Sequence, residues 1–373
     1  MESKIDFNYF LSERAKRRPK ASKFINFIFT TKDEWTMFGA GIPNICFNPF
    51  KSLEFSINDE NNSKITLTQQ ELNIAQEYPR GYGYPGLLDT LRDFQSRFHG
   101  LDVNNYEKTW ELFLTNGSQH SIAVIFEMML NDGDSLLIEE PTYGAVACVS
   151  NSRDINMVAL EMDDEGIIPE NLVSILSNWD YKKRFPKLMY LIPVGQNPTG
   201  LIYSQKRKLE ILSIAKRFNI LILEDDPYYF LQFPKEGQDD LETIPLEPSF
   251  LSMDKEGRVI RLDSFSKVLA PDSMKEILDK HLGDLVQYRV PDAGMYFWLK
   301  FQDLEDSFTF IKTYMIPTQI LFAPGVTFSN FRGFNQYLRA SFTHISLEEM
   351  DTTIETFSKV LKQYIKDKKE RNE

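Results

Sequence analysis

Short apolar runs alternate with helical patterns through the middle of the chain. Apolar runs of about four to eight residues predict buried strands, and apolar positions three or four residues apart predict helices. Helical patterns begin at Ser118, after Tyr143, at Pro169 and at Ser204. Because strand and helix alternate, we expect an α/β fold whose mostly parallel central sheet has helices on both faces. The predicted strands are WELFL (110–114), DSLLIEE (134–140), INMVALEM (155–162), KLMYLIPV (187–194), ILILEDD (220–226) and RVIRLDSFS (258–266).

The pattern changes after residue 271. A helix is followed by two apolar runs, LVQYRV (285–290) and MYFWLKF (295–301), which the turn PDAG separates. Further strands are predicted in QILFAP and NQYLRASF, and a long helix from residue 346. Strands joined by short turns, with helices at one side, predict a smaller α+β domain. We therefore expect an N-terminal arm (1–40), an incomplete large domain (41–270) and a small C-terminal domain (271–373).

Composition limits the class of partner. The 373 residues carry a formal net charge of -12, so the field of the molecule repels nucleic acid and anionic membranes. The one dense basic run, RAKRRPK (14–20), could be a targeting or anion-binding arm, but a solvated helix and turn is the interpretation that we favour. Two cysteines are too few for a disulfide framework, and no metal-site spacing accompanies them. No apolar run approaches about 18 residues. We expect a soluble, cytoplasmic protein.

The segment GYGYPG (81–86) matches the dinucleotide-binding pattern GxGxxG. That pattern needs a buried strand before it and a helix N-terminus after it to hold a pyrophosphate. The preceding NIAQEYPR is polar, and Pro85 is interpreted as lying inside the loop. The sequence therefore favours a glycine-rich surface or active-site loop over a nucleotide site.

Three motifs follow the predicted strands. GQNPTG (195–200) could be a plain strand-to-helix turn, and EDDPYYF (224–230) a solvated strand end. Acidic residues at the carboxyl end of a parallel strand also lie where α/β sheets bind ligands. In DSFSK (263–267), Lys267 could be an ordinary surface lysine, or a nucleophile if its surroundings lower its pKa.

The order of these motifs is more specific than any one of them. With TNGSQ before them and FAPGVTF and YLRASF after them, the chain resembles the fold-type-I aminotransferases that use pyridoxal phosphate (PLP). Within that group it is similar to the fungal aromatic and 2-aminoadipate aminotransferases, a branch that includes kynurenine aminotransferase. The resemblance covers most of both predicted domains.

The resemblance implies roles for residues around the cofactor ring. Lys267 would bond to the cofactor aldehyde and, once the substrate displaces it, would move a proton at the substrate α-carbon. Asp225 would pair with the pyridinium nitrogen. Tyr228 and Asn197 would hydrogen-bond the ring 3′-oxygen, and Tyr143 would stack on the ring.

The resemblance also implies a phosphate site and a substrate site. The phosphate would lie at the start of the helix after TNGS, where free amides favour an anion. Arg339 would hold the substrate α-carboxylate with its planar guanidinium, beside Asn197. The implied reaction is transamination of an aromatic amino acid, 2-aminoadipate or kynurenine with a 2-oxo acid such as 2-oxoglutarate, in a homodimer. The implied phosphate donors are Ser118, Gln119, Ser264, Ser266 and, reaching the neighbouring subunit's phosphate, Tyr78.

One block expected from the resemblance is absent. Relatives follow SFSKVLAP with a GxRxGW segment, whose arginine binds the phosphate, but here DSMKEILDKHLGDL follows directly. The block after residue 270 would hold a strand, helices and part of the dimer interface. A skipped coding segment or a spliced isoform is the favoured explanation over a deliberate deletion or natural divergence. A catalytically impaired isoform, and another PLP reaction such as C–S lysis or decarboxylation, stay open as alternatives.

Overall fold

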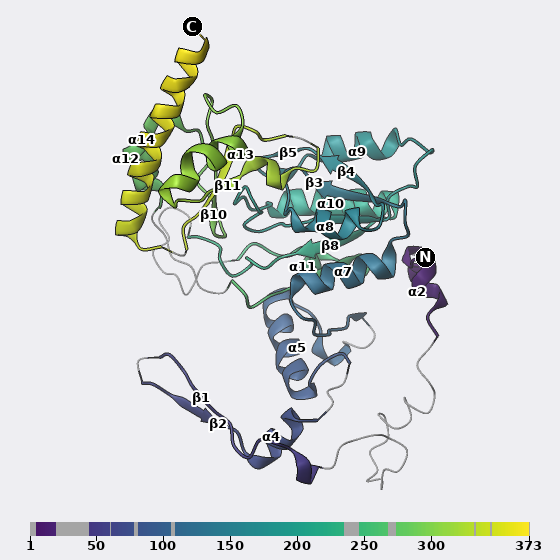
Figure 1. Ribbon diagram of the computed structural model, residues 1–373. Coiled ribbons are helices and arrows are strands. Elements are labelled where there is room, and N and C mark those ends of the chain that lie inside the picture. The colour runs from purple at the N-terminus through teal and green to yellow at the C-terminus, as the bar shows by residue number, and fades with distance from the viewer. Residues whose placement is uncertain are drawn as a thin grey trace. The chain divides into compact units, whose positions relative to one another are not determined.

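Figure 1 shows the computed structural model of the chain. It divides into two compact units, of which the first contains Met1–Arg17, His99–Leu101 and Asn116–Glu373 and the second contains Arg18–Phe98 and Asp102–Thr115. The predicted domain boundaries at residues 40 and 270 lie outside the described residues. The structure describes residues 5–19, 45–59, 61–77, 81–105, 109–234, 246–267, 274–331, 333–343 and 345–372.

A parallel sheet forms the centre of the first unit. Its five strands lie in the order β4-β3-β7-β8-β9, and every neighbouring pair is parallel. This arrangement confirms the predicted α/β fold class. The chain runs from β3 to β4 on one side and then to β7 on the other, so the direction of winding reverses between β3 and β7, where open α/β sheets bind ligands. The strands are β3 (Ser135–Glu139), β4 (Asn156–Leu160), β7 (Leu188–Leu191), β8 (Leu221–Asp225) and β9 (Val259–Leu262).

Helices cover both faces of this sheet. Because successive side chains of a strand point to opposite faces, Ile138 and Tyr190 pack in one core cluster, while Leu137 and Met189 pack in another. The first cluster includes α7 (Ser118–Met129) and α8 (Ala145–Asn151). The second includes α9 (Pro169–Ser177), α10 (Gln205–Phe218) and α11 (Phe250–Met253), with the short hairpin β5 (Met162–Asp163) and β6 (Gly166–Ile167) beside it.

A smaller antiparallel sheet follows in the same unit. Its strands lie in the order β10-β12-β11. Phe297 and Leu338 pack in a core cluster with the helices, so the alternate residues Tyr296 and Arg339 lie on the opposite face of the sheet. The elements are β10 (Tyr296–Lys300), β11 (Ala323–Pro324), β12 (Tyr337–Ser341), α12 (Met274–His281), α13 (Ser307–Phe310) and α14 (Leu347–Asn372).

The remaining helices are short and lie before or between these elements. In the first unit, α1 (Phe7–Phe10) and α2 (Glu13–Arg17) precede the central sheet. Short 3-10 helices span Ile45–Phe47, Val103–Asn105, Gly283–Leu285, Ile316–Thr318 and Gly325–Phe328, and a π-helical turn spans Ile311–Met315. In the part of the chain that the structure describes, no helix has the length and apolar character needed to cross a membrane.

The second unit corrects one detail of the glycine-rich segment. It contains the hairpin β1 (Glu54–Ser56) and β2 (Lys64–Thr66), followed by α4 (Gln69–Ala75). The interpretation that Pro85 lies inside the loop is wrong, because α5 (Pro85–His99) begins at that residue. Proline suits the first helical position, whose amide needs no partner in the helix. A helix, α4, and not a strand is the last element described before the loop, so the nucleotide site is still not favoured.

Two predicted strands do not form. Residues 110–114 have no strand structure: the amide of Leu114 donates to Tyr82 O at 2.9 Å, but no ladder of paired residues is described there. Residues 285–290 make one isolated bridge, in which Gln287 and Lys300 exchange two backbone hydrogen bonds of 2.8 Å. Apolar composition alone predicted these strands, and the tertiary pairing that a strand needs is missing.

Candidate active site

Asp225 lies at the carboxyl end of β8 and is 3% exposed. Its Oδ2 accepts a hydrogen bond of 2.6 Å from the hydroxyl of Tyr190 on the neighbouring strand β7. Its Oδ1 is buried and has no hydrogen-bond partner. Burial raises the pKa of Asp225 to about 6. Buried polar atoms are nearly always paired. The unpaired Oδ1 therefore suits an acceptor for a hydrogen-bond donor on a bound ligand.

Arg339 on β12 is held beside the loop that follows β7. Its Nη1 donates to Asn197 Oδ1 at 2.9 Å, while its Nε is buried without a partner. Its guanidinium carbon lies 4.0 Å from the ring centre of Tyr296 and 4.7 Å from that of Phe328. Burial lowers the pKa of Arg339. A guanidinium stacked on aromatic rings keeps a fixed direction, and its spare donor suits a planar anion such as a carboxylate.

Two tyrosines complete the same cluster. Tyr228 is buried, and its hydroxyl donates to the Tyr296 hydroxyl at 3.4 Å. Tyr143 follows β3 and is half-buried. Burial and then the charge of Asp225 raise the pKa of Tyr143. The structure thus brings together five residues that the sequence proposed, which we call the Asp225 cluster: Tyr143, Asn197, Asp225, Tyr228 and Arg339.

The other two acidic residues of the EDD motif do not belong to this cluster. Arg261 on β9 is buried and contacts both of them, with Nη1 at 2.6 Å from Asp226 Oδ2 and 3.2 Å from Glu224 Oε1. Burial raises the pKa of Asp226 to about 7. Glu224 also accepts the amides of Phe250 and Leu251, at 2.7 and 3.1 Å. All three acids are buried, so the interpretation of this strand end as solvated is wrong.

A buried network holds the loop that carries Asn197. Glu139, at the end of β3, accepts hydrogen bonds from Gln196 Nε2 at 3.0 Å and from the Tyr203 hydroxyl at 2.5 Å. Gln196 Nε2 also donates to Pro141 O at 2.8 Å. Burial raises the pKa of Glu139 to about 8. The network joins the ends of β3 and β7, where the sheet changes direction, and so fixes the position of the loop.

The proposed phosphate donors lie in two places. Ser118 is the first residue of α7, whose cap residue Gly117 has no side chain to bind the first amides. Gln119 Nε2 donates to Ala145 O at 3.3 Å, which links the start of α7 to the start of α8. Ser264 donates its hydroxyl to Ser266 Oγ at 2.8 Å in the segment after β9.

Lys267 is half-buried and follows this pair of serines. In the described part of the chain, no hydrogen bond or ion pair joins it to the Asp225 cluster. The sheet register still places its segment nearby, since Leu262 pairs with Asp225 and the chain leaves β9 at the same edge of the sheet. Tyr78 lies outside the described residues.

Sequence reasoning missed Tyr190, Tyr296 and Glu139. Tyr190 carries the only hydroxyl in the apolar strand LMYL, which was a usable signal, because a buried tyrosine hydroxyl needs a partner. Tyr296 alternates with core residues on β10 and therefore lies on the face of Arg339. For Glu139 the sequence gives no such signal, because its partners come from another strand end.

Comparisons with known proteins agree with the expected family. The sequence profile described as aminotransferase class I and II matches residues 53–270. The chain is 35% identical over 432 positions to an aromatic amino acid aminotransferase of Dictyostelium discoideum, with 98% of this chain and 89% of that protein covered. It is 32% identical to the mitochondrial kynurenine/alpha-aminoadipate aminotransferase of Rattus norvegicus, with 86% and 90% covered. The fold is similar to that of the Candida albicans aminotransferase Aro8, at a TM-score of 0.81 and 23% identity over 97% and 99% of the two chains. These findings confirm the predicted resemblance.

Proposed function

We propose, since the chain belongs to the class I and II aminotransferase family, that it transfers the amino group of an aromatic amino acid to a 2-oxo acid such as 2-oxoglutarate. Enzymes of this family depend on PLP. The observation that carries the proposal is Asp225, whose Oδ2 is held by Tyr190 while its buried Oδ1 lacks a partner. That oxygen fits the ring N–H of PLP, which needs a buried anionic acceptor.

The proposed cofactor site uses residues from the edge of the sheet. When bound, PLP withdraws electrons from the substrate, so that a proton on the α-carbon becomes acidic. The amine of Lys267 would bond to the cofactor aldehyde and later carry that proton. Asp225 would hold the ring proton, Tyr228 and Asn197 would donate to the ring 3′-oxygen, and Tyr143 would cover one face of the ring.

The proposed phosphate site combines the start of α7 with the segment after β9. The first amides of a helix point outward and favour an anion. Ser118 and Gln119 belong to that first turn, and the hydroxyls of Ser264 and Ser266 are already paired with each other. Tyr78 would be a further donor, to the phosphate of a neighbouring subunit.

Arg339 would bind the substrate. Its Nε has no partner and its Nη1 is tied to Asn197, so the guanidinium is held in one orientation before a substrate arrives. A carboxylate that binds to it would bring the α-carbon toward the same loop as Asn197. The aromatic rings of Tyr296 and Phe328 against the guanidinium also keep water away from it, which strengthens the ion pair.

A second candidate substrate is kynurenine or 2-aminoadipate. The rat relative, at 32% identity, is named for both of these amino acids. Product formation that depends on an added 2-oxo acid, measured over a panel of aromatic amino acids, kynurenine and 2-aminoadipate, ranks the substrates. Turnover without a 2-oxo acid would instead indicate lysis or decarboxylation.

The first test of the proposal is chemical labelling. The purified chain is incubated with PLP, reduced with borohydride and digested, and the modified lysine is mapped by mass spectrometry. We expect the label on Lys267, with Lys255 of the same strand-and-turn region as the internal control. Folded protein without a label on Lys267 would contradict the proposal and favour a catalytically impaired isoform.

We also propose that the chain forms a homodimer and works in the cytoplasm. Its family membership supports the dimer and its small-molecule substrates, and its strongly negative charge makes binding to nucleic acid or to an anionic membrane unfavourable. Sedimentation of the purified chain tests the dimer. Cell fractionation tests the location, and a mitochondrial fraction would contradict it.

A further inference from the structure

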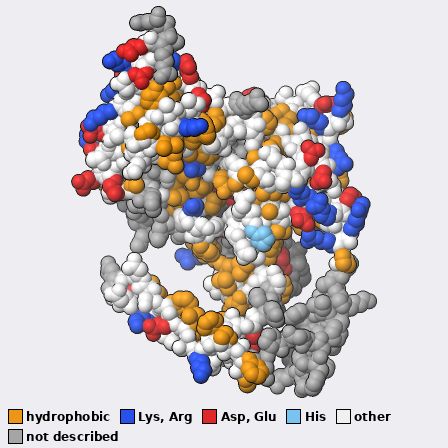
Figure 2. All heavy atoms as spheres, in the orientation of Figure 1, with side chains coloured by type: hydrophobic (Ala, Val, Ile, Leu, Met, Phe, Trp, Pro, Cys, Tyr) orange, Lys and Arg blue, Asp and Glu red, His pale blue; other side chains and the backbone are white. Residues whose placement is uncertain are grey.

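The part of the basic run that lies in the first unit, Arg14–Arg17, has a defined position there. Within this run, α2 carries Arg14 and Arg17. Ser12, just before α2, donates its amide to Met128 O at 2.7 Å and its hydroxyl to Glu127 O at 2.8 Å. These bonds to the end of α7 fix the helix, so its arginines have a defined position. Figure 2 shows Lys and Arg side chains gathered on the surface around α2.

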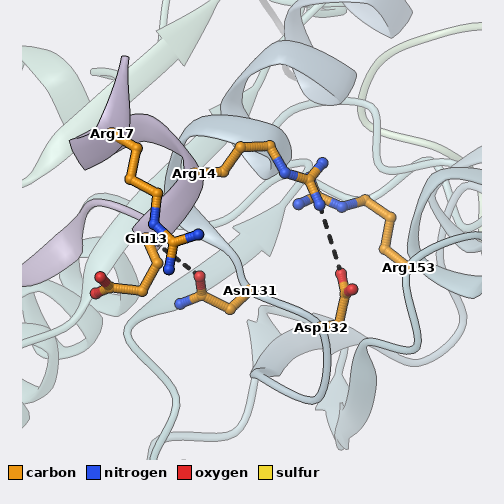
Figure 3. Close-up of a pocket in the computed structure, with 6 residues that line it drawn as sticks. All are labelled: Glu13, Arg14, Arg17, Asn131, Asp132 and Arg153. Carbon is orange, nitrogen blue, oxygen red and sulfur yellow. Dashed lines mark hydrogen bonds and ion pairs between the residues drawn. The ribbon is translucent and has the colours of Figure 1, made fainter. Parts of the chain in front are cut away.

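A cavity of about 290 Å³ lies between α2 and two turns of the same first unit. One turn joins α7 to β3 and supplies Asn131 and Asp132, and the other follows α8 and supplies Arg153. In Figure 3 the side chains of Arg14 and Arg153 extend toward the same region of this cavity. Two segments that are far apart in the sequence therefore place arginines in one hollow. The lining residues are Glu13, Arg14, Arg17, Asn131, Asp132 and Arg153.

Arg153 is held in place by one hydrogen bond, but its other guanidinium donors lack partners. Its Nη2 donates to Leu130 O at 2.8 Å, which fixes the plane of the guanidinium. Its Nε and Nη1 are buried and have no hydrogen-bond partner. A buried charged donor without a partner is unfavourable, so an anion that reaches these atoms and accepts their hydrogen bonds gains binding energy there.

The acidic residues of the cavity offset only part of this positive charge, and the hydrogen bond and charge of Lys16 and then the charge of Arg17 lower the pKa of Glu13. Glu13 forms its ion pair with Lys16, at 2.9 Å, and its amide donates to Asn131 Oδ1. Asp132 is 3.9 Å from Arg14, and its side chain is 66% exposed. An exposed pair at that distance contributes little. Arg14 and Arg153 therefore line a cavity in which Asp132 is only loosely paired.

We propose that this cavity binds a small doubly charged oxyanion, with Arg153 and Arg14 as its principal donors and Arg17 beside them. The planar guanidinium suits the oxygens of a phosphate or of a carboxylate, and two sources, inorganic phosphate or a small dicarboxylate, share this chemistry. None of the lining residues belongs to the Asp225 cluster or to the proposed PLP site. The site is therefore independent of the proposed function.

The test measures binding of inorganic phosphate, and separately of succinate, to the chain saturated with PLP, by isothermal titration calorimetry. We expect one of the two anions to bind, and the substitutions Arg153→Gln and Arg14→Gln each to weaken binding at least tenfold. Arg153→Lys keeps the charge without the planar group, so we expect an intermediate loss. Binding of phosphate alone identifies a phosphate site, and binding of succinate alone identifies a dicarboxylate site.

Two controls separate this cavity from exposed positive charge elsewhere and from the proposed PLP phosphate site. Arg217→Gln removes an exposed positive charge on α10 and should leave binding unchanged. Ser264→Ala alters the proposed PLP phosphate site and should also leave it unchanged. Because Arg14 is on the surface, its variant is expected to fold even if Arg153→Gln does not. Binding that persists in Arg14→Gln, or that is lost in Ser264→Ala alone, or no binding of either anion, would overturn the proposal.

Discussion

At the level of single residues, burial and the hydroxyl of Tyr190 act in opposite directions on the pKa of Asp225. The hydrogen bond of 2.6 Å favours the carboxylate form, while burial raises its pKa to about 6. Without the hydroxyl, the pKa of Asp225 rises further. We predict that PLP binding by the natural chain weakens as the pH falls through about 6, and that Tyr190→Phe moves this loss to higher pH. Cofactor affinity, measured by fluorescence between pH 5 and 8, checks this.

A matched variant tests whether the effect belongs to Asp225. Tyr203→Phe also removes a buried tyrosine hydroxyl, but one that donates to Glu139. We expect this variant to leave the pH midpoint of cofactor binding in place. Equal shifts in both variants would show that loss of any buried hydroxyl perturbs the site, and would contradict a specific role for Tyr190.

Glu139 leads to a prediction about stability. Its pKa in the folded chain is about 8, above the ordinary value of 4.5, because burial disfavours the charged form. A raised folded-state pKa stabilises the fold fully below pH 4.5, and this contribution is lost as the pH rises through 8. Glu139→Gln removes this titration. We predict that the loss of unfolding free energy between pH 4.5 and 8 is smaller in the variant, by no more than about 5 kcal/mol.

Urea unfolding at several pH values measures this dependence. The comparison of variant with natural chain isolates Glu139, because Asp225 and Asp226 also have raised pKa values and contribute to both proteins. If the two proteins lose stability equally between pH 5 and 8, folding does not raise the pKa of Glu139, and the prediction is wrong.

Strand-end position and the family resemblance singled out Asp225 and Lys267. The structure brings Asp225 together with four other proposed residues, whereas the role of Lys267 stays a prediction. Tyr190 and Glu139 could not be singled out, because their roles come from partners on neighbouring strands. These partners are far apart in the sequence and become neighbours only when the sheet forms.

At the level of elements, two glycines permit the contact between the loop after β7 and the turn before β10. Gly195 has φ +57°, and a Cβ on it would lie 2.8 Å from Gly294 Cα. We predict that Gly195→Ala lowers the free energy of unfolding by at least about 2 kcal/mol, from left-handed strain plus a backbone clash. The loop carries Asn197, so we also expect weaker substrate binding through Arg339.

Gly133→Ala is the control for this substitution. Gly133 has a similar φ of +79°, but nothing lies within 4 Å of a Cβ at that position. Its variant should show the conformational strain alone, about 1–2 kcal/mol, with unchanged KM. Thermal unfolding and steady-state kinetics measure both effects. Equal losses in the two variants would mean that the contact with Gly294 is not tightly packed.

The elements differ in how well the sequence predicts them. Strands buried on both faces, such as β3 and β8, are continuous apolar runs and were predicted. Residues 110–114 are also mostly apolar, but the structure shows no strand there, and the amide of Leu114 bonds to Tyr82 O in the glycine-rich loop. Pro85 was interpreted as lying inside the loop, but proline is also favoured at the start of a helix. Local patterns do not distinguish these outcomes.

At the level of the whole molecule, the Dictyostelium relative has residues within the aligned region that this chain lacks. The alignment with the Dictyostelium relative spans 432 positions, 59 more than the 373 residues of the chain, so that relative has at least 59 positions without a counterpart here. The family match ends at residue 270, three residues after Lys267. Both observations support the block proposed to be absent there. Among the described strands, β9 pairs only with β8, so its other edge has no strand beside it.

This comparison leads to a prediction for a longer chain. A chimera carries, after residue 270, the segment of the Dictyostelium relative that has no counterpart here. If that segment supplies a strand beside β9 and an arginine for the cofactor phosphate, it adds a charged hydrogen bond of about 1.5–3 kcal/mol. We predict that the chimera binds PLP at least about tenfold more tightly than the 373-residue chain. Fluorescence titration of PLP measures both affinities.

The control for the chimera is a Gly/Ser insertion of equal length at the same place. It lengthens the connection from Lys267 to the small sheet without adding a strand or a cation, and a flexible loop of this size has a modest entropic cost. If the control gains affinity as the chimera does, the short connection and not the missing block limits the site. If neither gains, the 373-residue chain already assembles its complete cofactor site, and the absent block is dispensable for PLP binding.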